Sequence, residues 1–128
     1  MNYQKIKTFE DACAALKIDA NALPDFSMLP EKYRNALLAH YKLLIVIEAI
    51  NEGWKPNWAD TNERKYTPWF SVSEEDSKPS GFGLSFGGYD VWYSYTFVGS
   101  RLFYPDIERA KHVFENFKNL YEEYMLIS

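Results

Sequence analysis

The sequence predicts an α+β domain in which helices near both ends of the chain enclose a meander of antiparallel strands. Apolar residues recur at intervals of three and four in two segments before Gly53 and in one segment after Pro105, which is the spacing of helices with a buried face. Between these segments, large apolar residues alternate with small or polar ones, as in half-buried strands. Helices separated in sequence from a run of strands are typical of α+β domains. We therefore predict two N-terminal helices, a meander of three to four antiparallel strands, and a long C-terminal helix packed on one face of the sheet, all in a single domain over residues 1–128.

Start and stop signals place the two N-terminal helices. The Thr8 hydroxyl can cap a helix over residues 9–17 by accepting a bond from an early backbone amide. Pro30 suits the first turn of a second helix, because proline loses no needed hydrogen bond there, and Gly53 suits its left-handed C-cap. Residues 43–50 are apolar on nearly all sides, so this second helix is predicted to lie at the centre of the domain.

Four segments after the second helix have the composition of strands, and they are residues 65–72, 82–87, 89–98 and the short 100–104. Pro68 cannot donate to a strand ladder, so the first segment is predicted at an edge of the sheet or at a bulge. Gly87 and Gly88 predict a tight hairpin turn between the second and third segments. Alternation within the third segment places on one face Tyr89, Val91, Tyr93, Tyr95 and Phe97.

The composition fits one globular domain with a high aromatic content. Of the 128 residues, 47% are hydrophobic and 25% are charged, so the chain can bury one core but is too short for two. Aromatic residues make up 18% of the chain, and the formal net charge is −4. Because attraction to phosphates supplies much of nucleic-acid affinity, an acidic chain makes nucleic acid a less favoured partner. The single cysteine, Cys13, excludes an internal disulfide.

An aromatic-rich segment between Gly53 and Phe70 is the main candidate for a functional surface. Its aromatic rings are mixed with amide and cationic side chains, a combination that protein interfaces enrich. The alternative interpretation is that this segment lies over the sheet and buries its tryptophans to cap the core. The candidate binding residues are Trp54, Lys55, Asn57, Trp58, Lys65, Tyr66, Trp69 and, from a later segment, Arg101.

No motif for catalysis, a cofactor or a metal stands out. His40 and His112 lie far apart in sequence and in no ligand spacing, and the glycines of residues 81–88 introduce no helix that could hold a phosphate. Glu48 interrupts the apolar half of the second helix, where an exposed or ion-paired position is expected. We therefore expect no catalytic residue, no cofactor and no metal. A small enzyme built from a tertiary cluster such as Glu48, His40 and Arg101 is the least favoured alternative.

The pattern favours a non-enzymatic interaction protein that binds a protein partner, or a second copy of itself, through the aromatic segment and neighbouring strand faces. The main alternative is a single-stranded nucleic-acid-binding protein, in which aromatic rings stack on bases while cations such as Arg64 contact phosphate. The longest apolar run, residues 43–47, is far shorter than the ~20 residues of a membrane span, and residues 1–5 lack the apolar core of a signal peptide. We expect a cytoplasmic protein that does not engage a membrane.

Four segments also resemble a family of uncharacterised proteins from gut Bacteroidetes and from their phages and prophages. They are residues 7–13 (KTFEDAC), 51–58 (NEGWKPNW), 65–70 (KYTPWF) and 99–102 (GSRL). The segments follow one another in the same order as in the family and extend over most of the chain, while the helix after Pro105 fits the pattern less closely. The resemblance implies a bacterial or phage protein of the cytoplasm, and it implies no activity, cofactor or catalytic residue.

Overall fold

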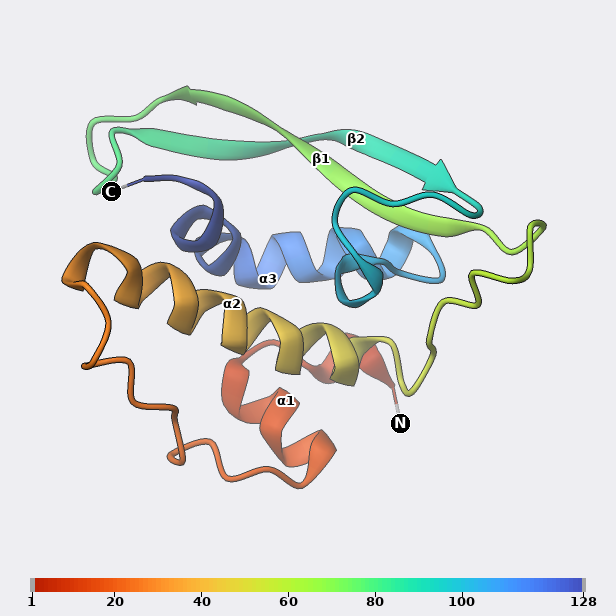
Figure 1. Ribbon diagram of the computed structural model, residues 1–128, viewed down its shortest axis with the longest axis horizontal. Helices are drawn as coiled ribbons and strands as arrows, with labels where there is room; N and C mark the ends of the chain where they lie inside the picture. Colours follow the sequence, from red (N-terminus) through yellow and green to blue (C-terminus); the bar gives the residue numbers. More distant parts are fainter. Residues whose placement is uncertain (1, 128) are drawn as a thin grey trace.

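A two-stranded hairpin and three α-helices stack in layers (Figure 1). The computed structural model describes residues 2–127. The hairpin covers α3, α3 lies on α2, and α1 lies on the other side of α2. The α+β class is confirmed, with two α-helices before the strands and one after them. The elements are the 3-10 helix η1 (Tyr3–Lys5), α1 (Phe9–Leu16), α2 (Glu31–Ile50), β1 (Lys65–Glu74), β2 (Phe82–Trp92), the 3-10 helix η2 (Ser100–Leu102) and α3 (Ile107–Met125).

The helices begin where the capping residues predict. Thr8 Oγ1 accepts a hydrogen bond from the amide of Asp11 at 3.1 Å, and the Asp11 carboxylate accepts one from the amide of Thr8 at 3.1 Å. This reciprocal capping box satisfies two amides that the first turn of α1 leaves unpaired. α2 starts directly after Pro30 and ends at Ile50. Gly53 has a positive φ of 86°, but its predicted role as the C-cap is wrong, because Asn51 caps α2 and Glu52, with φ of 52°, is the first left-handed residue after it.

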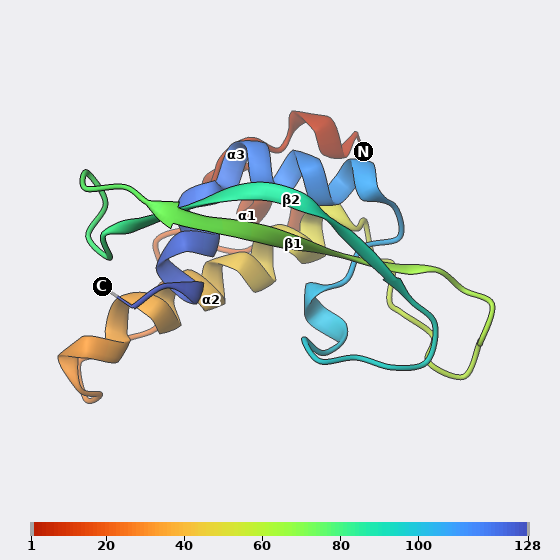
Figure 2. The same ribbon diagram turned by 90° about the horizontal axis from the view of Figure 1, so that it is seen from above.

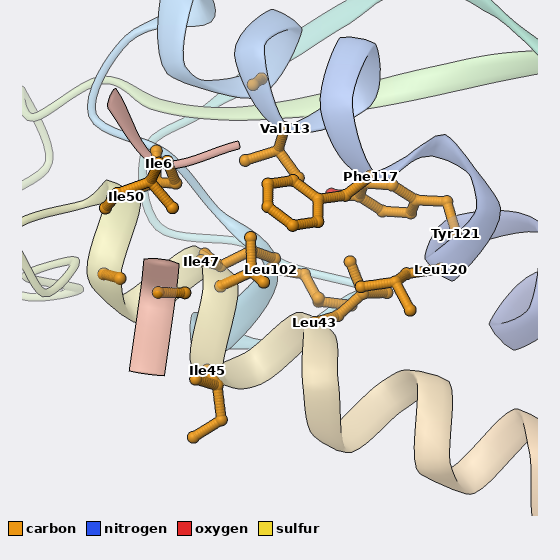
Figure 3. Packing of buried hydrophobic residues seen from close by; sticks show 14 of the residues in the cluster. Ile6, Leu43, Ile45, Ile47, Ile50, Leu102, Val113, Phe117, Leu120 and Tyr121 are labelled. Atoms are coloured by element: carbon orange, nitrogen blue, oxygen red, sulfur yellow. The ribbon is translucent and has the colours of Figure 1, made fainter. Parts of the chain in front are cut away.

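The core lies mainly between α2 and α3. Figure 3 shows the facing side chains, which include Leu43 and Ile47 of α2 and Val113, Phe117 and Leu120 of α3. From Leu43 to Ile50, the residues of α2 are buried except for Leu44, which is half-buried, and Glu48, which is exposed. The prediction of a central helix is therefore confirmed, and the apolar faces of α2 are covered by α1 on one side and α3 on the other.

One polar pair crosses the buried core. The hydroxyls of Tyr104 and Tyr121 lie 2.7 Å apart, and both side chains are almost completely buried. Burial raises the pKa of both hydroxyls, because ionisation would place a charge away from water. The two groups therefore satisfy each other as neutral hydrogen-bonding partners.

The predicted meander of three to four strands is wrong, because the sheet of residues 2–127 has two strands. Residues 82–92 form one continuous strand, and the hairpin turn lies before them, where the Glu75 amide donates to Gly81 O at 2.9 Å. Residues 93–98 leave the sheet. The segment 100–104, predicted as a strand, forms η2 and then a single bridge between Tyr104 and Tyr66.

The glycine pair predicted as a hairpin turn is a β-bulge inside β2. Trp69 pairs with Gly88 and Phe70 pairs with Phe86, so Gly87 is an extra residue in β2. The Trp69 ring packs against both glycines, and a Cβ atom on Gly87 would fall 2.0 Å from Trp69 Cζ3. A bulge moves the alternation by one residue. Large residues on both sides of the bulge, such as Phe86 and Tyr89, therefore share the face that carries Phe70.

Pro68 lies at an edge of the sheet, as predicted. The Tyr66 amide donates to Tyr104 O at 2.9 Å, and the Tyr104 amide donates to Tyr66 O at 2.8 Å. The backbone of Tyr66 thus points away from β2, and that of Pro68 points the same way because strand directions repeat every two residues. The missing amide hydrogen of Pro68 therefore removes no bond to β2.

Candidate interaction surface

Lys65, a predicted binding residue, is a buried cation at the start of β1. Its side chain is 0% exposed, and its ammonium donates to the carbonyl oxygens of Asp60 at 3.2 Å, Glu63 at 3.1 Å and Tyr93 at 2.6 Å. The Glu63 carboxylate lies 3.4 Å away. An ammonium has three donors, so these carbonyls match its full capacity. Lys65 therefore joins the loop before β1 to the chain after β2 and is not accessible to a partner.

Trp58 packs into the same group of loops, and the neighbouring Asn57 is exposed. Trp58 Nε1 donates to Ser100 Oγ at 2.7 Å, and the ring meets Phe103 edge-on with centroids 5.4 Å apart. The Lys65 ammonium lies 5.2 Å from the centroid of the Trp58 ring, within the range of a cation–π contact. The backbone amide of Asn57 donates to the Glu63 carboxylate at 2.7 Å. For these residues the interpretation that the segment caps the domain fits the contacts.

The other predicted binding residues lie on separate elements. Lys55 is exposed and Trp54 is half-buried, both in the loop that follows α2. Trp69 is 49% exposed on the face of β1 opposite Phe70. Arg101 is exposed in η2. Of the predicted binding residues, Trp58 and Lys65 are thus brought into direct contact, and Asn57 is linked to Lys65 through the Glu63 carboxylate.

A second group, which the predicted list missed apart from Tyr66, lies on the face of the hairpin that carries Phe70. Tyr66 opposes Val91, so the side chains of Tyr89 and Tyr93, two residues to each side of Val91, share its face. The ring centroids of Tyr66 and Tyr89 are 5.6 Å apart. The pKa of the exposed Arg64 guanidinium is raised. The largest cause is hydrogen bonding to the Tyr66 hydroxyl, and the nearby Tyr93 hydroxyl adds a smaller effect. We call this group the Arg–Tyr surface: Arg64, Tyr66, Tyr89 and Tyr93.

The Arg–Tyr surface is open to solvent although it continues the face that packs on α3. Tyr89 is 46% exposed and Tyr93 is 40% exposed, whereas Phe70, nearer the hairpin turn, stacks on Phe114 of α3 with centroids 4.9 Å apart. Alternation had placed Tyr89 and Tyr93 on one face. The sequence gives no signal for their accessibility, because it depends on where α3 begins beneath the hairpin (Figure 1).

A small cavity of about 220 Å³ lies near the hairpin turn, between that turn and the end of α3, with Lys78, Phe82, Asn119, Glu122 and Leu126 among its lining residues. Glu122 is 8% exposed. Its carboxylate accepts a hydrogen bond from the Leu84 amide at 2.8 Å and lies 3.2 Å from the Lys78 ammonium. Because these groups balance the carboxylate, the cavity marks the attachment of the hairpin to α3.

The residues considered for catalysis are dispersed. His40 packs edge-on against Tyr124 with centroids 4.4 Å apart, Glu48 is exposed, and Arg101 lies in η2. His112 Nε2 lies 2.6 Å from the carbonyl oxygen of Ile6, where it joins the N-terminal segment to α3. Across residues 2–127, no three His, Cys, Asp or Glu side chains are grouped closely enough to hold a metal ion.

The arrangement defines an α+β domain in which a long, bulged hairpin covers the outer of two packed helices. No family model, curated protein or solved structure matches the chain. The resemblance to a Bacteroidetes and phage family therefore stays a prediction. Within the described part of the chain, no helix combines the length and the apolar character that crossing a membrane requires.

Proposed function

We propose that this is a non-enzymatic interaction protein that binds a protein partner through the Arg–Tyr surface. The observation that supports the proposal most directly is the exposure of Tyr89 and Tyr93, at 46% and 40%, beside an exposed arginine at the start of β1. Arginine and tyrosine are among the residues that contribute most binding energy in protein interfaces. Their side chains combine a large apolar area with polar groups that set direction.

The surface is ordered before a partner arrives. Each tyrosine extends from a strand or directly follows one, and the rings of Tyr66 and Tyr89 pack together with centroids 5.6 Å apart. Side chains that are already held in place lose less conformational entropy on binding. Arg64 keeps donor capacity for an acidic or carbonyl group of the partner, because a guanidinium has five N–H donors.

Charge favours a protein over a nucleic acid as the partner. Of the cations that the sequence offered to phosphate, Lys65 is buried, while Lys55 and Arg101 lie on elements other than the Arg–Tyr surface. The chain as a whole carries a net charge of −4. A groove that follows a nucleic-acid backbone needs several accessible cations along one path. The four residues of the Arg–Tyr surface include one cation, Arg64.

The test is affinity capture with matched variants, followed by titration of purified components. Tagged wild-type protein, a Tyr89→Ala/Tyr93→Ala variant and a Tyr33→Ala control are used to capture partners from a bacterial lysate. Tyr33 is a suitable control because it is 51% exposed in the first turn of α2. Figure 1 shows the start of α2 far from the loop end of the hairpin, where β1 begins and β2 ends. Any captured protein is then purified and titrated, and the double variant should bind at least about tenfold more weakly.

Circular dichroism and urea unfolding of all three proteins establish that the folds are equivalent. Equal affinity of the wild type and the Tyr89→Ala/Tyr93→Ala variant for the purified partner would contradict the proposed surface. Tight, salt-resistant binding of a single-stranded oligonucleotide, lost in the same variant, would favour the nucleic-acid alternative instead.

A further inference from the structure

The outer edge of β1 near the hairpin turn is the feature that carries a further inference. The Leu84 amide donates to Glu122, on the side of β2 away from β1. Val72 opposes Leu84, and opposed residues of an antiparallel pair direct their backbone groups alike, either toward each other or away. The N–H and C=O of Val72 therefore point outward, and those of Phe70 and Glu74 follow because directions repeat every two residues.

This stretch of edge is unpaired. Within residues 2–127, no backbone or side-chain partner is bonded to the outward amides of Phe70, Val72 and Glu74. Elsewhere the edges are interrupted: Tyr104 pairs with Tyr66, Pro68 has no amide hydrogen, and the Gly87 bulge and the Glu122 contact divide the edge of β2. Seen from above, β1 forms the border of the sheet on the side of α2 (Figure 2). An unpaired, regular edge is complementary to the backbone of another strand.

We propose that residues 70–74 of β1 pair antiparallel with the same residues of a second copy of this chain. The side-chain pattern around Val72 is symmetric, since Ser71 and Ser73 flank it. A two-fold axis at Val72 opposes the two valines, opposes Ser71 to Ser73 of the second copy, and opposes Phe70 to Glu74 of the second copy. The two hairpins then form one continuous four-stranded antiparallel sheet, which removes both open edges.

The side chains favour this self-pairing. Val72 is 55% exposed on the face that carries Phe70, so opposing valines cover apolar surface that one copy leaves in water. The exposed serines on the other face can hydrogen-bond across the pair. The axis also keeps the Glu74 carboxylates of the two copies apart, because each faces Phe70 of the other copy. Like charges directly opposite would disfavour the pair.

Proline substitution tests the edge without removing bonds to β2. Because the Val72 amide points outward, Val72→Pro removes an edge donor and leaves the β1–β2 ladder intact. Val72→Thr is the matched control, since it keeps the amide and the β-branched shape. Sedimentation equilibrium should give twice the 15.0 kDa monomer mass for wild type and Val72→Thr, and the monomer mass for Val72→Pro. A monomeric wild type, or a dimer that Val72→Pro leaves intact, would overturn the proposal.

Cysteine cross-linking decides the register and does not depend on the proline variant folding. The two-fold axis places the Val72 Cα atoms of the two copies about 5.5 Å apart, which a disulfide can bridge. Two copies of Ser73 are diagonal neighbours at roughly 7–8 Å, beyond that reach. Mild oxidation should therefore yield covalent dimers of Val72→Cys and few of Ser73→Cys. Equal cross-linking of both variants, or none of either, would overturn the two-fold axis at Val72.

Discussion

The two halves of the hairpin are held against the rest of the molecule in different ways. Toward the turn, Phe70 stacks on Phe114 of α3, with centroids 4.9 Å apart and planes at 20°. At the loop end, Lys65 is fixed by carbonyl groups of the loops on both sides of the hairpin. The bulge at Gly87 separates the halves. A buried cation can thus attach the end of a strand pair that extends past the helix beneath it, provided that nearby loops supply hydrogen-bond acceptors for the cation.

Removing the aromatic anchor of the half near the turn is expected to have the largest effect. Phe70 contacts the rings of Phe86, Phe114 and Tyr121. Phe70→Ala should lower the free energy of unfolding by about 3 kcal/mol, from lost apolar burial and the cavity that remains. Tyr89→Ala is the control, because Tyr89 lies on the same face but is 46% exposed. Urea unfolding that gave equal losses for the two variants would contradict the anchoring role of Phe70.

Removing the cation of the loop end should have the next largest effect. Lys65→Met keeps the apolar stem but leaves the carbonyl groups of Asp60, Glu63 and Tyr93 without their donor. Urea unfolding should show a loss of about 1.5–3 kcal/mol, the range for hydrogen bonds to a charged group. Lys55→Met is the matched control, since Lys55 is exposed, and it should change stability little. Hydrogen exchange should accelerate first at residues 88–92, and a uniform acceleration along the hairpin would count against two separate halves.

A double-mutant cycle can test why the bulge between the two halves requires Gly87. Gly87→Ala adds a methyl group where the Trp69 ring packs, and the exposed ring can give way, so a loss of about 1 kcal/mol is expected. In a Trp69→Ala background the same substitution should cost much less, because its steric conflict is gone. Equal penalties in both backgrounds would show that Gly87 is required for its backbone conformation rather than for the contact with Trp69.

The helices could be predicted because their signals are local. Thr8 with Asp11 specifies the start of α1, and Pro30 specifies the start of α2. The strands were harder because one signal has two structural causes. Large residues change from even to odd positions at Gly87, and this change of phase fits either a turn or a bulge. The Trp69 ring packed on the glycines distinguishes the two, and that contact is not visible in the sequence.

The candidate site was harder to predict for a related reason. Trp58, Lys65 and Tyr66 lie close in sequence and have the composition of an interface. Their roles differ because Trp58 and Lys65 are held by residues far along the chain, Ser100 and Tyr93, while the Tyr66 side chain faces Tyr89. Burial set by such distant partners separates a structural aromatic or cation from an accessible one.

The smallest expected effect concerns pH and the helices beneath the hairpin. His40 of α2 packs against Tyr124 of α3, and burial lowers its pKa below the ordinary value of 6.5. The unfolded chain therefore takes up this proton at a higher pH than the folded chain does, so its contribution to stability is complete above about pH 6.5 and is lost as the pH falls below that value. Urea unfolding between about pH 7.5 and about pH 5 should show a weaker pH dependence in His40→Gln than in wild type. If His40→Gln kept the full pH dependence of the free energy of unfolding, groups other than His40 would be its cause. Because α3 supports Phe70, the acid effect should loosen the half of the hairpin near the turn before the half that Lys65 holds.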